Sequence, residues 1–253
     1  MKKAITSLCG LGIFLVSGLA AAQQQYGGGY SGSYSPAPMP RPSGVDNIGE
    51  EAQITFGVDR VMGVAFDRAV ISATGGDVTN KATNVALFGN PGGASEAPSL
   101  MIPRLSLDYF VVESVSVGGS LLYFSQSTEQ ETPAGSGDGP TTTTFAIAPR
   151  VGYAMAFDET FSIWPRAGIT YFSSKSEQET TAGTNTTTFS GLDLTVEVPL
   201  GISPIENFAI LVGPYVDFGL SGTAKNEPPT GSGTEEDVKV TSYGLTVGIL
   251  GYY

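Results

Sequence analysis

Apolar side chains alternate with small or polar ones along most of the chain, from about residue 51 to its end. The alternation comes in segments of roughly 10 residues and has the period of β-strands. It is clearest in the last segment, where Tyr243, Leu245 and Val247 share one face and Gly244 and Thr246 the other. The other regular segments are 104–111, 116–123, 145–155, 161–171, 191–200 and 208–218.

The first strand begins at Ile54 with the same alternation, which loses its phase around Arg60. A β-bulge at that residue would restore the pattern. This strand and the seven later segments make eight predicted strands, an even number.

The connections between the predicted strands alternate in length. Short ones lie near Glu113, near 158–160 and at 203–207. Long ones, rich in Gly, Thr, Ser and acids, cover roughly 67–99, 128–141, 175–185 and 223–237. Bacterial outer-membrane barrels have short periplasmic turns and long extracellular loops in this order. The pattern therefore predicts an all-β, eight-stranded antiparallel transmembrane β-barrel over residues 51–253, with its apolar face toward lipid.

Two soluble folds remain as alternatives: a lipocalin-like barrel with an apolar interior, and a β-sandwich with one buried face. Both would turn the polar face toward water. That face is rich in Gly, Ala and Ser, which suits the narrow interior of an eight-stranded barrel better than a solvated exterior. We therefore favour the membrane barrel.

Composition excludes several classes of function. The chain contains no His, which removes the usual general base of Ser-His hydrolases and the commonest metal ligand. The net charge of −12 and the pI near 4.3 argue against a nucleic-acid partner. We expect no catalytic residues, no metal site and no cofactor.

The N-terminus has the three parts of a secretory signal peptide. Lys2 and Lys3 precede an apolar run over 11–16, and Ala20 and Ala22 occupy the A-x-A positions before a predicted cut. The single Cys, Cys9, lies within the predicted signal peptide of residues 1–22. The Gln-, Gly-, Ser-, Tyr- and Pro-rich stretch that follows predicts a flexible periplasmic linker over 23–50.

Charged side chains on the polar face would point into the barrel, where buried charges must be paired. A hairpin centred at Glu159 would place Arg150 opposite Gly168 and Arg166 opposite Gly152, so that each Arg extends over a residue without a side chain. Such a network is either a plug that stabilises the barrel or the gate of a narrow ion path, and we favour the plug. The predicted lumen charge network comprises Asp59, Arg104, Asp108, Arg150, Arg166, Asp193, Glu197 and Asp217.

These features resemble the OmpA/OmpX-like family of small outer-membrane β-barrel proteins of Gram-negative bacteria. The run from Pro149 to Tyr153 is similar to the Pro-x-x-Gly-Tyr strand of such barrels. Thr246, Gly248 and Tyr253 resemble the terminal signal that the barrel assembly machinery recognises, although Gly251 stands where a hydrophobic residue is usual. The resemblance implies location in the cell outer membrane, with its lipid, lipopolysaccharide and that machinery as partners.

Four functions follow as hypotheses. The first is a non-enzymatic barrel that is structural or presents its acidic extracellular loops to an unknown surface ligand. The second is a small gated pore, and the third is a barrel-embedded enzyme, which the absence of His disfavours. The last is a secreted soluble β-barrel that binds an apolar ligand.

Overall fold

The structure is a computed structural model that describes residues 48–73, 76–87, 103–132 and 135–253. The predicted signal peptide (1–22) and the predicted linker as far as residue 47 lie outside the described residues. Among the described residues, no helix has the length and apolar character that a helical membrane span needs. The strands are β1 (Ile54–Ala73), β2 (Gly76–Leu87), β3 (Arg104–Val112), β4 (Val115–Thr132), β5 (Gly135–Tyr153), β6 (Met155–Ala156), β7 (Phe161–Ile163), β8 (Arg166–Thr180), β9 (Gly183–Glu197), β10 (Leu200–Ile205), β11 (Phe208–Glu227) and β12 (Thr234–Tyr252).

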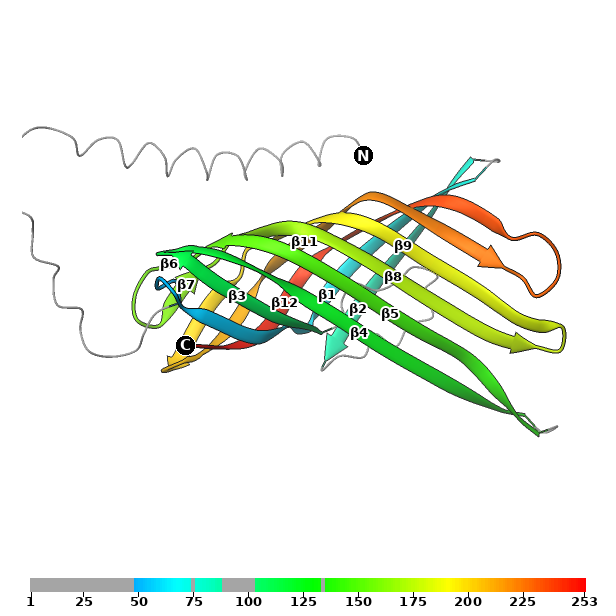
Figure 1. The fold of residues 1–253 in the computed structure, drawn as a ribbon, viewed down its shortest axis with the longest axis horizontal. Coiled ribbons are helices and arrows are strands. Elements are labelled where there is room, and N and C mark those ends of the chain that lie inside the picture. The colour runs from blue at the N-terminus through cyan, green and yellow to red at the C-terminus, as the bar shows by residue number, and fades with distance from the viewer. Residues whose placement is uncertain (1–47, 74–75, 88–102, 133–134) are drawn as a thin grey trace, which may run out of the picture. The chain divides into compact units, whose positions relative to one another are not determined.

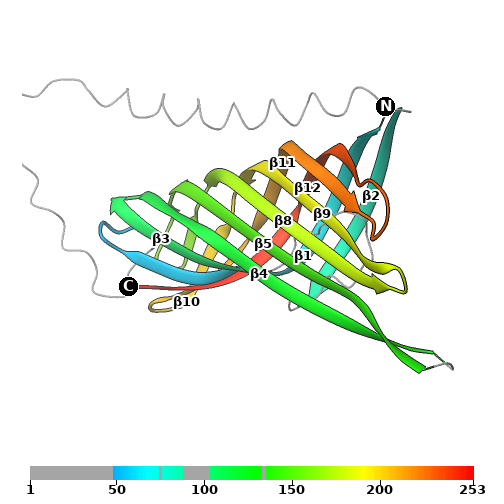
Figure 2. The same cartoon turned by 45° about the vertical axis from the view of Figure 1, so that its right-hand side comes forward.

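The strands close into the predicted eight-stranded antiparallel barrel (Figures 1 and 2). Around the barrel the pairing runs from β1 through β3, β4, β5, β8, β9 and β11 to β12, which pairs with β1 again. Three of the eight barrel strands are interrupted. β5 and β6 are separated at Ala154, and prolines stand at the other two breaks: Trp164–Pro165 between β7 and β8, and Val198–Pro199 between β9 and β10. Because proline has no N–H to donate, it is suited to such breaks in the hydrogen-bond ladder.

The predicted long loops are wrong in extent, because most of their residues continue the strands as hairpins. Hydroxyl side chains pair within and between these hairpins, as in Ser127 with Thr141 at 3.1 Å across β4 and β5, and Thr142 with Ser176 at 3.3 Å across β5 and β8. Such cross-strand pairs of Thr and Ser stabilise a sheet even where no apolar alternation remains. We call this end of the barrel the hairpin end, and the opposite end the short-turn end.

The first predicted loop contains β2, a strand that pairs with β1 from Met62 to Ala73. β3 pairs with β1 only from Ile54 to Asp59. In the described part of the chain, β4 beyond Leu121 pairs with β5 alone. On this side of the barrel, β1 therefore pairs with β3 in the short-turn half and with β2 in the hairpin half.

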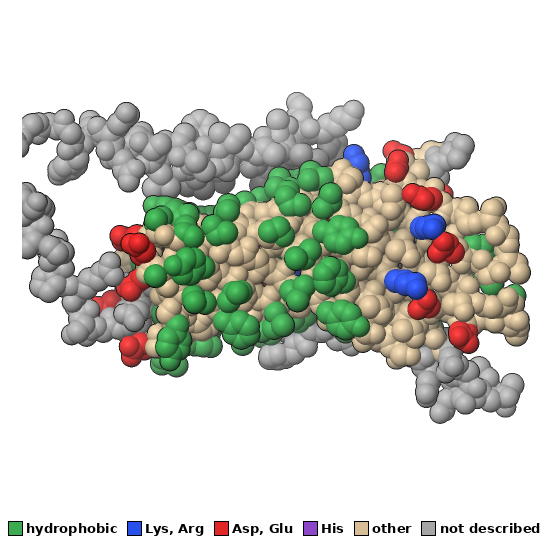
Figure 3. Space-filling view, viewed as in Figure 1, with side chains coloured by type: hydrophobic (Ala, Val, Ile, Leu, Met, Phe, Trp, Pro, Cys, Tyr) green, Lys and Arg blue, Asp and Glu red, His purple; other side chains and the backbone are tan. Residues whose placement is uncertain are grey.

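The apolar side chains lie on the outer face, which forms a belt around the barrel (Figure 3). Phe56, Leu107 and Tyr123 are 61%, 57% and 72% exposed, whereas the side chains that alternate with them point into the lumen and are buried. An apolar exterior around a polar interior is the arrangement of a transmembrane barrel. It is the reverse of the lipocalin-like alternative, in which the apolar face would be inside.

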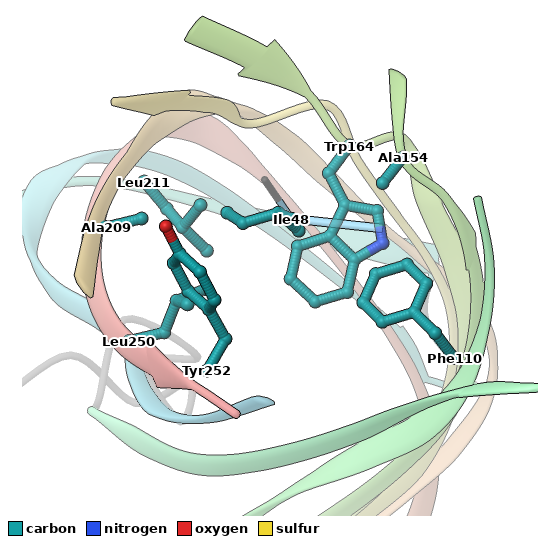
Figure 4. Close-up of a cluster of buried hydrophobic side chains, with 8 residues drawn as sticks. All are labelled: Ile48, Phe110, Ala154, Trp164, Ala209, Leu211, Leu250 and Tyr252. Atoms are coloured by element: carbon teal, nitrogen blue, oxygen red, sulfur yellow. The ribbon is translucent and has the colours of Figure 1, made fainter. Parts of the chain in front are cut away.

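The short-turn end of the lumen is filled by an apolar cluster (Figure 4). Ile48 lies in its centre, between Trp164 on one side and Leu211 and Tyr252 on the other. Ile48 is only 3% exposed, so the predicted linker, which was to extend to residue 50, ends earlier than expected. The cluster comprises Ile48, Phe110, Ala154, Trp164, Ala209, Leu211, Leu250 and Tyr252.

The register predicted for the hairpin around Glu159 is the one observed. Arg150 lies opposite Gly168, and Gly152 lies opposite Arg166. A Cβ atom added at Gly168 would come within 2.1 Å of the carbonyl oxygen of Pro149 and 2.9 Å of the Cβ of Arg150. Glycine is therefore required at this position by close approach of the neighbouring strand.

We predict that Gly168→Ala destabilises the barrel by roughly 1–3 kcal/mol, the cost of overpacking a close contact. The matched control is Gly251→Ala, because an added Cβ there would meet its nearest atom at 3.5 Å. The measurement is the guanidinium midpoint for unfolding of each variant refolded in lipid vesicles. Equal midpoints for the two variants would contradict the close-approach argument.

Candidate functional site

The most distinctive site is a layer of charged side chains in the middle of the lumen. They come from six strands (β1, β3, β5, β8, β9 and β11), and none is more than 8% exposed. All eight residues of the predicted network lie in this layer, and a ninth, Arg60, joins them. The layer comprises Asp59, Arg60, Arg104, Asp108, Arg150, Arg166, Asp193, Glu197 and Asp217.

Arg60 forms the most completely buried part of the network. Its two Nη atoms donate to the two carboxylate oxygens of Asp217 at 2.7 and 3.0 Å, a bidentate pair. Nη2 also donates to Oε1 of Glu197 at 3.0 Å. The guanidinium lies 4.1 Å from the ring centroid of Tyr215, a cation–π contact. Arg60 is thus surrounded by two carboxylates and an aromatic face.

Arg150 forms the second bidentate pair, with Asp108. Its Nε and Nη2 donate to the two carboxylate oxygens at 2.9 and 2.6 Å. Its Nη1 donates to Oδ2 of Asp59 at 2.6 Å. Gly118, the residue of β4 opposite Arg150, lies on the path to β3 and has no side chain to obstruct it; a Cβ atom there would come within 2.5 Å of Oδ1 of Asp108.

Arg166 connects the two bidentate pairs. Its Nη2 donates to Oε2 of Glu197 at 2.8 Å and lies 3.3 Å from Oδ1 of Asp59. Its guanidinium lies 4.9 Å from the ring centroid of Trp164. Glu197 therefore accepts from both Arg60 and Arg166, and Asp59 accepts from both Arg150 and Arg166, which makes one continuous network.

Asp193 and Arg104 are the remaining members of the layer. The strand after Arg166 offers two acids, Asp193 and Glu197, and Arg166 contacts Glu197 and, on β1, Asp59. Asp193 is 1% exposed, and its carboxylate oxygens have no hydrogen-bond partner among the described residues. Arg104 is 2% exposed and lines a small cavity together with Ser120 and Thr195.

The sequence pattern missed Arg60 because simple alternation does not assign it to the lumen. The structure has the β-bulge expected near this residue: the register of β1 against β12 shifts between Val58 and Met62, and Arg60 has φ of 58°. The bulge places Asp59 and Arg60 both inside the barrel. The loss of phase was the available clue, since bulges re-aim side chains.

Apolar side chains close the lumen on both sides of the charged layer. The cluster around Ile48 and Trp164 fills the short-turn end. On the hairpin side lies a second cluster, comprising Ala69, Leu122, Ala146, Phe172, Val238 and Val240. Two cavities that border the charged layer have volumes of about 10 Å³ each, room for about one water molecule. The described residues thus leave no wide aqueous path through this layer.

The arrangement offers little for catalysis or for a cofactor. Within the described ranges, no group of three or more His, Cys, Asp or Glu side chains is placed to hold a metal ion. The carboxylates of the charged layer that accept hydrogen bonds do so from Arg side chains or from Thr195. Asp59, Asp108, Glu197 and Asp217 are thus engaged by Arg side chains, whereas Asp193 has no hydrogen-bond partner among the described residues.

The residues of the predicted assembly signal lie on β12 and just beyond it. Gly248 faces the bulged part of β1, where a Cβ atom would approach the carbonyl oxygen of Val58 to 3.0 Å. Thr246 is half-buried, and Tyr253 is 93% exposed. Backbone hydrogen bonds of 2.8 and 2.9 Å join Tyr253 and Ile54 and extend the closure of the barrel.

No protein-family model matches the chain, and no curated protein matches it by sequence. Solved structures with a similar fold include the outer membrane protein OprG from Pseudomonas aeruginosa, which is 11% identical with a TM-score of 0.49 and covers 81% of this chain and 97% of its own. The outer membrane protein AlkL is 10% identical with a TM-score of 0.46, covering 84% and 94%. The outer membrane protease OmpT from Escherichia coli is 10% identical with a TM-score of 0.41, covering 83% and 99%. The fold, an eight-stranded antiparallel barrel with an apolar outer face, follows from the strand pairing and the exposed apolar side chains of this chain itself.

We predict that Arg60→Ala lowers the free energy of unfolding by about 3–5 kcal/mol, because it leaves the buried carboxylates of Asp217 and Glu197 without their cation. The control is Lys225→Ala, which breaks an exposed ion pair with Glu227 and should change stability little. Unfolding midpoints in guanidinium measure both. A midpoint for Arg60→Ala as high as that of the control would show that the network does not stabilise the barrel.

Two isosteric changes on β9 should have opposite effects. Glu197→Gln removes the charge that accepts from Arg60 and Arg166, so we expect it to lower the unfolding midpoint. Asp193→Asn removes a buried charge that lacks a hydrogen-bond partner among the described residues, so we expect an unchanged or higher midpoint. A lower midpoint for Asp193→Asn than for Glu197→Gln would contradict the assignment of partners.

Proposed function

We propose that the protein is a non-enzymatic outer-membrane β-barrel with a closed lumen, which anchors polar hairpins at the cell surface. The observation that carries this proposal is the ion-pair network of Arg60, Arg150 and Arg166, enclosed between two apolar clusters. A lumen filled in this way stabilises the barrel and does not hold water-filled space for transport. In this orientation the short-turn end faces the periplasm and the hairpin end faces outward.

The hairpins support a role at the surface. Pairs of hydroxyls continue along them beyond the apolar belt, as in Ser125 with Thr143 and Ser127 with Thr141. Exposed acids accompany them, including Glu179 and Glu235. Sheet faces of this kind offer hydrogen-bonding groups to a ligand without apolar patches that would promote aggregation.

A small gated pore is the second candidate, because charged residues line the lumen. Ion passage would require movement of the network and of both apolar clusters. Enzymatic activity has less support: OmpT is an outer membrane protease, but this chain contains no His, and the carboxylates of Asp59, Asp108, Glu197 and Asp217 accept from Arg side chains. Assembly by the barrel assembly machinery, through Thr246, Gly248 and Tyr253, belongs to the same proposal.

The test is single-channel recording of the refolded protein in a planar bilayer. Folding is checked beforehand by circular dichroism and by heat-dependent migration in detergent gels. We expect a folded barrel that produces no discrete openings. Reproducible openings that change in Glu197→Gln would contradict the closed lumen and favour the pore, and recovery of the native protein from the soluble periplasmic fraction would contradict the membrane location.

A further inference from the structure

Exposed positive charge is confined to one side of the apolar belt. Of the described Lys and Arg side chains, four Arg lie in the lumen and the others are exposed. All the exposed ones lie on the hairpin side of the belt, whereas the rim at the short-turn end carries exposed acids such as Glu51, Glu113 and Glu206. Figure 3 shows this asymmetry: acids alone at one end of the belt, and Lys and Arg beyond its other edge. The exposed cations are Arg68, Lys81, Lys175, Lys225 and Lys239.

Three of these cations form a patch across adjacent strands, which we call the basic triad: Arg68 on β1, Lys81 on β2 and Lys239 on β12. Arg68 and Lys81 are direct cross-strand partners, so their Cβ atoms are roughly 5 Å apart. Lys239 lies opposite Val70, two positions from Arg68 on the same face, which puts it on the diagonal, roughly 7–8 Å away. Long side chains at these positions can reach one common anion.

The triad lies directly beside the lipid-facing belt. Phe66, two residues before Arg68, stacks on Tyr243 of β12 with ring centroids 5.5 Å apart. Aromatic side chains mark the boundary between acyl chains and headgroups in membrane barrels. A step of two residues along a tilted strand moves outward by only a few ångströms, so the triad lies at the depth of the headgroups.

The other two exposed cations differ in having acidic partners. Lys175 contacts Glu177 at 2.6 Å, and Lys225 contacts Glu227 at 2.7 Å. No ion pair of the triad is recorded among the described residues. The nearest acids on its face are Asp77 and Asp237, both opposite Ser72 and thus farther from the belt. On the β11 side, 218–222 carry no charge.

Like charges directly opposite each other destabilise a sheet, and the pairing of Arg68 with Lys81 is such a case. An anion bound between them would remove this cost. We propose that the basic triad docks the phosphate-bearing headgroup of an outer-leaflet lipid beside the barrel. The inference rests on the proposed orientation in the outer membrane, and it assigns to that proposal a lipid partner and the residues that bind it.

The test measures binding of diphosphoryl lipid A to the full-length protein, refolded in neutral detergent micelles, by native mass spectrometry. The variant is Arg68→Gln/Lys81→Gln/Lys239→Gln, and the control is Lys175→Gln/Lys225→Gln. At about fivefold in affinity for each basic side chain near a lipid surface, the triple variant should bind about 100-fold more weakly than the native protein. The control should lose less than about threefold, since each of its cations is already compensated by a carboxylate.

Equal affinity of the native protein and the triple variant would overturn the inference, as would equal losses in both variants, which would indicate a general charge effect. Inorganic phosphate at matched concentration is the further arm: if it displaces lipid A completely, the site binds free anions and not a lipid. If the triple variant does not fold, Lys239→Gln alone should lower affinity about fivefold, and unchanged affinity there would overturn the proposal.

The inference and the proposed function can fail separately. A barrel that is silent in planar bilayers but binds lipid A equally well without the triad retains the proposed function and loses the lipid site. A barrel that conducts but binds lipid A through the triad loses the closed lumen and retains the lipid site.

Discussion

The pairing of charges inside a narrow barrel is the constraint on which the rest of the structure depends. An unpaired ion in so small a lumen would be costly. Arg60 reaches Asp217, and Arg150 and Arg166 both reach Asp59, on strands far from their own in sequence, which joins the two sides of the lumen. Because each Arg contacts two acids, loss of one side chain affects several partners. The network therefore favours a single register for the barrel.

Glycine provides the space that this pairing needs. Gly118 lies opposite Arg150 on β4, and Gly152 lies opposite Arg166 on β5, so neither Arg meets a competing side chain at these positions. The apolar clusters on both sides exclude water, which strengthens the ion pairs between them. The interior is thus a sequence of layers (apolar, charged, apolar), and each layer depends on the packing of its neighbours.

The outer surface differs from the interior, because its surroundings change from lipid to water along the barrel axis. The belt meets acyl chains, the hairpins meet water, and the boundary between them carries Arg68, Lys81 and Lys239. The short-turn rim has no exposed cation among the described residues. The two ends of the barrel therefore differ in charge as well as in the length of their connections. In the proposed orientation, the exposed cations lie on the outward side of the belt.

The sequence by itself determined the strand number, the face that each strand turns to lipid and the register of Arg150 against Gly168, because alternation and turn spacing are local properties. The sequence pattern did not predict the hairpin extensions or β2, because strands rich in Thr and Ser show no alternation of apolar residues. Only the tertiary structure decided which acid each Arg contacts: of the two acids on β9, Arg166 contacts Glu197 and not Asp193, and its other partner, Asp59, comes from β1. The bulge at Arg60 brought a fourth Arg into the lumen. Which acid an Arg meets across the lumen depends on how the strands close into the barrel, and the local spacing of residues does not specify this.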